Sequence, residues 1–82
     1  MSMFQEDVMK ELAKARAKYR PMASAHEGWA VLREEVDELW EEVKKKPSRR
    51  NTEDMYSELV QVAAMAQRMA EDICLTGKGS EI

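Results

Sequence analysis

The sequence predicts an all-α fold, a three-helix antiparallel unit within a single domain of 82 residues. The composition favours helices, because Ala, Glu, Lys, Met and Leu are frequent and the chain has only three glycines. Apolar residues recur every three or four positions in three segments, and the two prolines, Pro21 and Pro47, separate these segments. We expect helices over about 3–19, 25–46 and 53–74, followed by a mobile polar tail over 76–82.

The first helix is bounded by two signals. Ser2 followed by Gln5 is typical of a capping box, and Pro21 ends the helix at Tyr19. We interpret the cations of this helix as a solvated face near a helix C-terminus, with a contribution to anion binding as the alternative. These cations are Lys10, Lys14, Arg16, Lys18 and Arg20.

The second helix begins after a predicted N-cap, Ser24, with Glu27 as its capping-box partner. The two tryptophans of this helix are interpreted as core or interface residues, because they are large and lie at core spacing. The alternative for Trp29 is that it stacks on a nucleobase. The predicted core face contains Trp29, Leu32, Val36, Leu39, Trp40 and Val43.

A basic segment connects the second and third helices. Lys44, Lys45 and Lys46 complement the dipole of the helix that they end, and Pro47 prevents its continuation. The cations of this connection could instead hold a polyphosphate, because guanidinium groups match phosphate oxygens. The candidates for phosphate binding are Lys45, Lys46, Arg49 and Arg50.

The third helix, capped by Asn51 or Thr52, carries a carboxylate inside its apolar face. Glu58 falls within this face, and a buried carboxylate needs a partner or a metal ion. Glu35 and Glu38, one turn apart on the second helix, are the nearest candidates. Three converging carboxylates are typical of a divalent-cation site with oxygen ligands. The predicted apolar face contains Met55, Leu59, Val62, Ala66, Met69, Ala70 and Ile73.

Two acidic blocks carry a family resemblance. The first is Glu34-Glu35-Val36-Asp37-Glu38, and the second is Glu58-Leu59-Val60-Gln61. They resemble the Glu-Glu-x-x-Glu and Glu-x-x-Asp blocks of the MazG-type nucleoside triphosphate pyrophosphohydrolases, within the all-α NTP pyrophosphatase superfamily. Gln61 stands where that family has Asp. The flanking segments His26-Glu27-Gly28-Trp29 and Val62-Ala63-Ala64-Met65-Ala66 also agree, so the resemblance covers about residues 24–74.

The resemblance implies hydrolysis of a nucleoside triphosphate to the monophosphate and pyrophosphate, with house-cleaning of the nucleotide pool as a role. It implies Mg²⁺, or alternatively Mn²⁺, held by Glu35, Glu38, Glu58 and Gln61. Glu34, Glu35 and Glu38 would be the catalytic residues, with Glu34 as an auxiliary ligand or orienting the attacking water. It also implies a homodimer or tetramer in which two chains complete a four-helix bundle, which suits so short a chain.

Other classes are disfavoured by composition. A net charge of −3 with alternating acids and bases gives no reason to expect nucleic-acid binding. No apolar stretch approaches the ~20 residues of a membrane span. The N-terminal segment lacks the pattern of a signal peptide, and a single cysteine cannot form a disulfide within the chain, so we expect a cytoplasmic protein. Two hypotheses without catalysis stay open. One is a MazG-like oligomerisation or protein-interaction module silenced by Gln61, and the other is an acidic regulator that binds a protein through Trp29 and Trp40.

Overall fold

The computed structural model describes residues 2–77. These residues contain helices and no strand, so the predicted all-α class is confirmed. Residues 78–82 of the predicted tail lie outside the described residues. The elements are α1 (Met3–Lys18), α2 (Ala25–Val43), the 3₁₀ helix η1 (Pro47–Arg49), α3 (Thr52–Met69) and the π-helical turn η2 (Ala70–Cys74), which continues α3.

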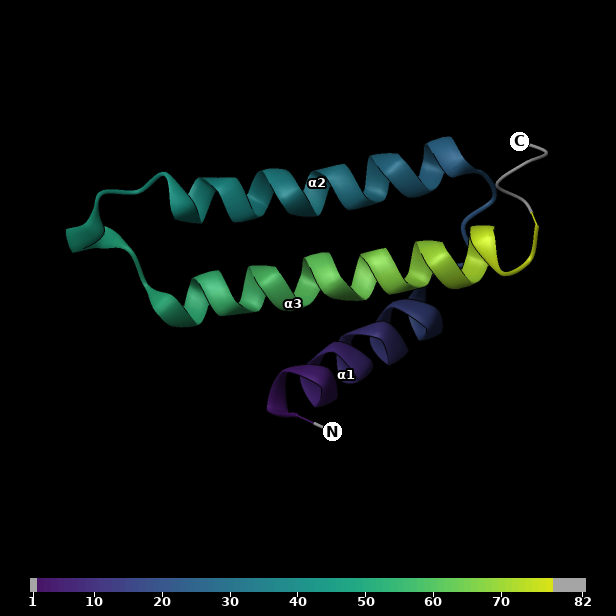
Figure 1. Cartoon of the computed structure of the whole chain (residues 1–82), viewed down its shortest axis with the longest axis horizontal. Helices are drawn as coiled ribbons and strands as arrows, with labels where there is room; N and C mark the ends of the chain where they lie inside the picture. The colour runs from purple at the N-terminus through teal and green to yellow at the C-terminus, as the bar shows by residue number, and fades with distance from the viewer. Residues whose placement is uncertain (1, 78–82) are drawn as a thin grey trace.

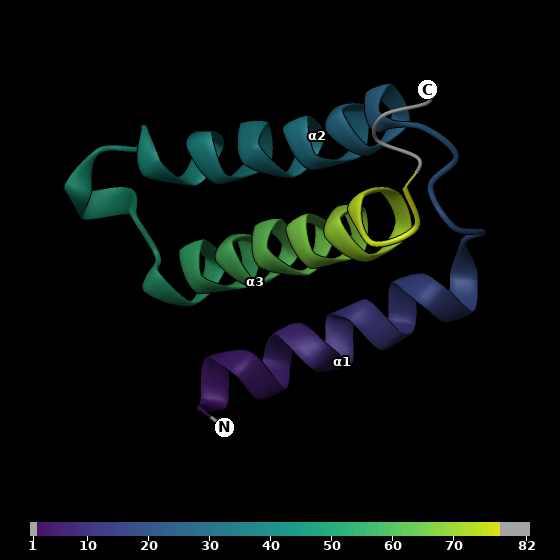
Figure 2. The ribbon, with the colours of Figure 1, turned by 45° about the vertical axis from the view of Figure 1, so that its right-hand side comes forward.

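The central element is α3. The helices α2 and α3 lie side by side and antiparallel, joined through η1, while α1 packs against α3 and crosses it obliquely (Figures 1 and 2). The connection after α1 returns the chain to the C-terminal end of α3, where α2 begins (Figure 2). No helix within residues 2–77 combines the length and the apolar character that crossing a membrane requires.

Local capping explains where the helices start. Ser2 and Gln5 form the predicted capping box, with N–H···O distances of 3.2 and 2.7 Å. Ser24 Oγ accepts the Glu27 N–H at 3.1 Å, but the Glu27 carboxylate accepts the Ala23 N–H instead of completing a box. At α3, Asn51 Oδ1 accepts two backbone N–H groups of the first turn, at 2.8 and 3.1 Å.

The second helix ends earlier than predicted. It stops at Val43, and Lys46 adopts an extended backbone with ψ of 144° instead of continuing the helix. The cause is Pro47, whose ring disfavours the α conformation in the residue before it. Lys45 and Lys46 therefore belong to the connection and not to α2.

The buried core lies between α1 and α3. Val8, Val60, Ala64 and Met65 form one buried cluster, with Phe4 and Tyr56 packed edge to face at its border. The apolar face predicted for α3 differs from the face that is buried in this core. Because α3 contacts α1 on one side and α2 on another, its buried residues cover a wide sector of the helix. Three positions that were predicted to lie in the core are exposed instead: Leu59, Ala66 and Ala70.

The predicted core face of α2 was also wrong in part. Trp29, Val36 and Trp40 are exposed, with 53%, 39% and 57% of their surfaces accessible. The reason is that α2 contacts α3 through a neighbouring face, which contains the buried Gly28 and the half-buried Leu32, Leu39 and Val43. Helical geometry places the three exposed residues on the side of the hairpin that Leu59 of α3 also faces. We call these four residues the outer apolar face.

A buried ion-pair network fastens the end of the bundle where α1, α2 and α3 meet. Asp72, 6% exposed, accepts the Met22 N–H at 2.9 Å and pairs with Arg16 at 2.9 Å. Although burial opposes it, the Met22 hydrogen bond and the Arg16 ion pair hold the pKa of Asp72 below its usual value. Arg68, 5% exposed, donates to the carbonyl of Arg20 at 2.8 Å. This network fixes the direction in which the chain enters α2.

Candidate metal centre and adjoining groove

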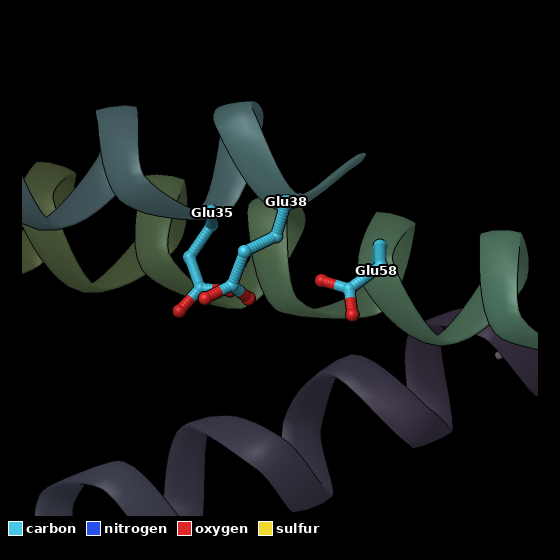
Figure 3. Close-up of side chains that lie close together, drawn as sticks. All are labelled: Glu35, Glu38 and Glu58. Atoms are coloured by element: carbon cyan, nitrogen blue, oxygen red, sulfur yellow. The ribbon is translucent and has the colours of Figure 1, made fainter. Parts of the chain in front are cut away.

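Three carboxylates converge where α2 faces α3. Glu35 and Glu38 lie one turn apart on α2, and Glu58 reaches toward them from α3 (Figure 3). One oxygen from each side chain lies within 4.8 Å of the others. The antiparallel hairpin thus brings together the three acids that helical spacing had placed near one another.

The cluster is partly closed to water and lacks neutralising groups. Glu35 and Glu58 are half-buried and Glu38 is exposed. The Oε2 atoms of Glu35 and Glu58 are buried without a hydrogen-bond partner in the part of the chain that the structure describes. Within residues 2–77, no lysine or arginine forms an ion pair with any of the three. Such an arrangement costs folding free energy unless a cation or protons compensate it.

The pKa values of the cluster reflect the same excess of negative charge. Burial, followed by the negative charge of Glu38, raises the pKa of Glu35 to about 7. Burial and the charge of Glu38 also raise the pKa of Glu58. In the absence of a cation, Glu35 is therefore partly protonated at near-neutral pH.

The donor set suits a hard divalent cation. Carboxylate oxygens are the ligands that Mg²⁺ and Mn²⁺ take in proteins, and the two buried oxygens without partners would gain the ligation that they lack. Mg²⁺ keeps several water molecules and binds through few carboxylates together with substrate phosphates. The exposure of Glu38 leaves one side of the cluster open for them.

A groove of about 600 Å³ adjoins the cluster. Its walls come from α1 and α2, and its floor comes from α3. This volume falls within the range of small-molecule sites in proteins. The floor consists of Gln61, Met65 and Arg68, the α1 wall and the turn after it supply Glu11, Lys14, Ala15, Lys18, Tyr19 and Arg20, and the α2 wall supplies Glu27, Val31, Glu34 and Glu35.

Gln61 has a partner outside the acidic cluster. Its side chain interacts with Glu11 of α1, and this interaction is the main cause that lowers the pKa of Glu11. A carboxylate attracts the amide N–H group, so the amide oxygen is the atom left for a ligand in the groove. Gln61 therefore lines the groove beside Glu35 without belonging to the three-acid cluster.

The other sequence candidates are distributed differently. Glu34 lines the groove next to Glu35, whereas Trp29 lies on the outer apolar face. The described lining of the groove contains none of the four predicted phosphate-binding cations. Two of them have local partners, because Lys45 pairs with Glu42 at 2.8 Å and Arg50 donates to the Val43 carbonyl at 3.0 Å. The remaining two, Lys46 and Arg49, are exposed in the same connection.

Sequence reasoning did not assign the cations that do line the groove. Lys14 and Lys18 of α1 line it, and so does the buried Arg68 of α3. The signal that could have identified Lys14 and Lys18 was the row of cations on α1, which we interpreted as a solvated face with anion binding as the alternative. Arg68 gave no signal, because a single arginine in a helix reads as a solvated residue.

Taken together, an acidic cluster with uncompensated oxygens beside a mixed-charge groove defines a candidate divalent-metal and anion site in a small helical protein. Comparison with protein-family models finds no match, and comparisons with curated proteins and with solved structures find no significant match. The MazG-type assignment therefore stays a prediction that rests on the two acidic blocks.

Proposed function

We propose that this protein is a metal-dependent nucleotide pyrophosphohydrolase, which converts a nucleoside triphosphate to the monophosphate and pyrophosphate. One observation carries the proposal. Glu35 and Glu58 each bury a carboxylate oxygen without a hydrogen-bond partner among residues 2–77, in a three-acid cluster beside a groove of nucleotide size. The resemblance of the two acidic blocks to the MazG-type enzymes supports the same activity.

Each side chain of the site has a role in this proposal. Glu35, Glu38 and Glu58 would hold Mg²⁺ or Mn²⁺, which when bound polarises phosphate oxygens and water. Glu34, on the groove wall, would orient the attacking water, and the amide oxygen of Gln61 would be a neutral supplementary ligand. Lys14 and Lys18 face the same groove and would balance the phosphate charge, in place of the cations of the α2–α3 connection.

The direct test is pyrophosphate release from a panel of nucleoside triphosphates with Mg²⁺. We expect Glu38→Gln to lower the rate by about 100-fold or more, the loss typical for a group that stabilises developing charge. Asp37→Asn is the matched control, because it removes the same charge from an exposed side chain of α2 that pairs with Arg33. An equal loss in both variants, or no release from any nucleotide by the wild type, would contradict the proposal.

We also propose that the outer apolar face is covered by a second copy of the chain. Trp29, Val36, Trp40 and Leu59 are all more than a third exposed, and the molecule measures only 20 Å along its shortest axis. That thickness is about two helix diameters, so no further layer of residues 2–77 covers this face of α2 and α3. Pairing of two hairpins would complete a four-helix bundle and enlarge a small core.

Sedimentation and tryptophan fluorescence test the assembly. A dimer would bury both tryptophans, so the emission maximum should shift to the red on dilution. Trp40→Glu should give a monomer, whereas Leu75→Glu, at an 80% exposed position outside the outer apolar face, should not. A wild-type monomer at all concentrations would exclude this assembly.

The interaction of Gln61 with Glu11 favours a second candidate function. If Gln61 serves only to tie α1 to α3, the chain is a helical oligomerisation module without catalysis. In that case Mg²⁺ would leave the melting temperature of the wild type unchanged, and Glu35→Gln and Glu38→Gln would raise thermal stability equally with and without Mg²⁺.

A further inference from the structure

The two ends of the groove differ in chemistry. One end lies beside the acidic cluster and contains Glu35, Gln61 and Glu11. The other end lies near the bundle terminus and contains Tyr19 and Arg68. Gln61 and Arg68 are seven residues apart on α3, which corresponds to about 10 Å along the helix. The groove is therefore long enough for a ligand that carries phosphates at one end and a ring system at the other.

Arg68 has more hydrogen-bond donors than its surroundings use. Its side chain is 5% exposed, yet it makes one short bond, from Nη2 to the Arg20 carbonyl at 2.8 Å. A weaker contact joins Nη1 to the Met65 sulfur at 3.8 Å. Nε has no hydrogen-bond partner in residues 2–77, and the nearest Asp72 oxygen is 3.9 Å away. A buried guanidinium with spare donors is stabilised by an additional acceptor.

The neighbours of Arg68 suit a planar ring. The Tyr19 ring centroid lies 5.6 Å from the Arg68 Cζ, and the tyrosine is 53% exposed at the rim of the groove. Val31 and Met65 supply apolar surface between the two ends. The acceptors of Glu27 at this end are engaged, because its carboxylate binds Arg20 and the Ala23 N–H. This end of the groove therefore presents guanidinium donors and an aromatic ring, with Lys18 Nζ 5.2 Å from the ring centroid.

We propose that this end of the groove binds the base of the nucleotide. We further propose that Arg68 selects guanine and uracil, which carry a carbonyl oxygen at C6 or C4, over adenine and cytosine, which carry an amino group at that position. Arginine donors match the O6 and N7 acceptors of guanine, whereas the amino group of adenine or cytosine presents a donor to the cation. The inference rests on the proposed function in one respect, which is that the acidic end receives the phosphates. It adds a class of substrate to that function.

The first experiment uses uncharged nucleosides in EDTA, which probe the base without metal or phosphate. Inosine and adenosine differ in the group at C6, and uridine and cytidine differ in the group at C4. Titrations followed by ¹H–¹⁵N correlation spectra should show tighter binding of inosine and uridine by about tenfold, within the range for one good arginine–base contact. Equal or tighter binding of adenosine or cytidine would overturn the proposal without any variant.

Substitutions then locate the source of the preference. Arg68→Lys should reduce each ratio to within about twofold, and its folding is checked from the same spectra. Tyr19→Ala should weaken all four nucleosides while leaving the ratios unchanged, because stacking does not distinguish carbonyl from amino groups. Arg33→Lys, exposed and paired with Asp37 outside the groove, is the control. If Arg68→Lys is folded and keeps the wild-type ratios, Arg68 does not read the base.

The outcomes separate this inference from the proposed function. Pyrophosphate release that depends on Glu38, without any nucleoside preference, would retain the enzyme and reject base selection by Arg68. A preference in EDTA, without release from any triphosphate, would retain the base site and reject the enzyme.

Discussion

The helix α3 and its π-helical extension carry buried carboxylates in two opposite electrostatic settings. Asp72 in η2 is enclosed by Arg16, Arg68 and the Met22 N–H, so its charge is neutralised within the chain. Glu58 in α3 faces Glu35 and Glu38, and one of its oxygens is buried with no hydrogen-bond partner among residues 2–77. One site joins charges that stabilise the fold, and the other gathers charges that repel.

The pKa values separate the two sites in the same way. The pKa of Asp72 is lowered despite its burial, whereas burial and neighbouring acids raise the pKa of Glu58 and bring that of Glu35 to about 7. A folded protein that tolerates such repulsion has given up stability at that position, and perturbed carboxylates of this kind concentrate at functional sites. The difference supports the proposal that the three-acid cluster binds a ligand, whereas Asp72 stabilises the fold.

The largest effect is expected from breaking the neutralised site. Asp72→Ala leaves Arg68 as a buried charge without its Asp72 partner and removes the acceptor of the Met22 N–H. We expect a loss of about 3–5 kcal/mol in the free energy of unfolding, measured by urea denaturation. Asp72→Asn, which keeps an oxygen for Met22, should lose less. A change below about 1 kcal/mol in Asp72→Ala would show that the network is not a structural anchor.

The acidic cluster was predictable from sequence because helical periodicity is a local property. The spacing of Glu35 and Glu38 and the position of Glu58 within an apolar face follow from 3.6 residues per turn. The neutralised site was not predictable, because Arg16 and Asp72 lie far apart in the sequence and meet only after α1 packs on α3. Trp29 and Trp40 were predicted to lie on the core face and are exposed. Periodicity identifies an apolar face but does not show whether the same chain or another chain covers it.

The second prediction concerns divalent cations. Mg²⁺ at about 100 times its dissociation constant should add roughly 2.7 kcal/mol to the stability at pH 8. At pH 5 the effect should be much smaller, because Glu35, with a pKa of about 7, is then protonated and metal binding must displace the proton. Thermal melts with MgCl₂ at both pH values, and with Glu58→Gln as the variant, measure this. A shift of equal size at both pH values, or in the variant, would place the cation elsewhere.

The third prediction is the pH dependence without metal. Glu35 has a folded-state pKa of about 7, above its usual value of 4.5. The folded protein therefore binds more protons than the unfolded chain between these values, and stability falls as pH rises from about 5 to about 8. We expect a fall of about 1–2 kcal/mol, less than the full pKa difference implies, because the cluster is partly open to water.

Glu35→Gln is the control for this pH dependence. It removes the titrating group, so urea midpoints of the variant in EDTA should be nearly flat over the same interval and higher than those of the wild type at pH 8. Below about pH 4.5 both proteins should lose stability together. Hydrogen bonds from Gln67 and Arg16 lower the pKa of Glu71, and those from the Met22 N–H and Arg16 lower the pKa of Asp72, so protonation of either group weakens the fold. A wild-type curve that rises between pH 5 and pH 8 would refute the raised pKa of Glu35.

The smallest effect is expected where the spacing between α2 and α3 is set, at the contact of Gly28 with Met69. A Cβ added to Gly28 would lie 2.7 Å from Met69 Cγ, so Gly28→Ala must displace that side chain or separate the helices. Overpacking costs about 1–3 kcal/mol and the gain in helix propensity is about 1, so we expect a net loss of about 1 kcal/mol. The same separation would draw Glu35 and Glu38 away from Glu58 and weaken Mg²⁺ binding. Met69→Ala in the same chain removes the clash and should restore Mg²⁺ binding, and a double-mutant cycle measures the coupling in stability. If Gly28→Ala changes stability but leaves Mg²⁺ affinity intact, the helix spacing does not control the geometry of the acidic cluster.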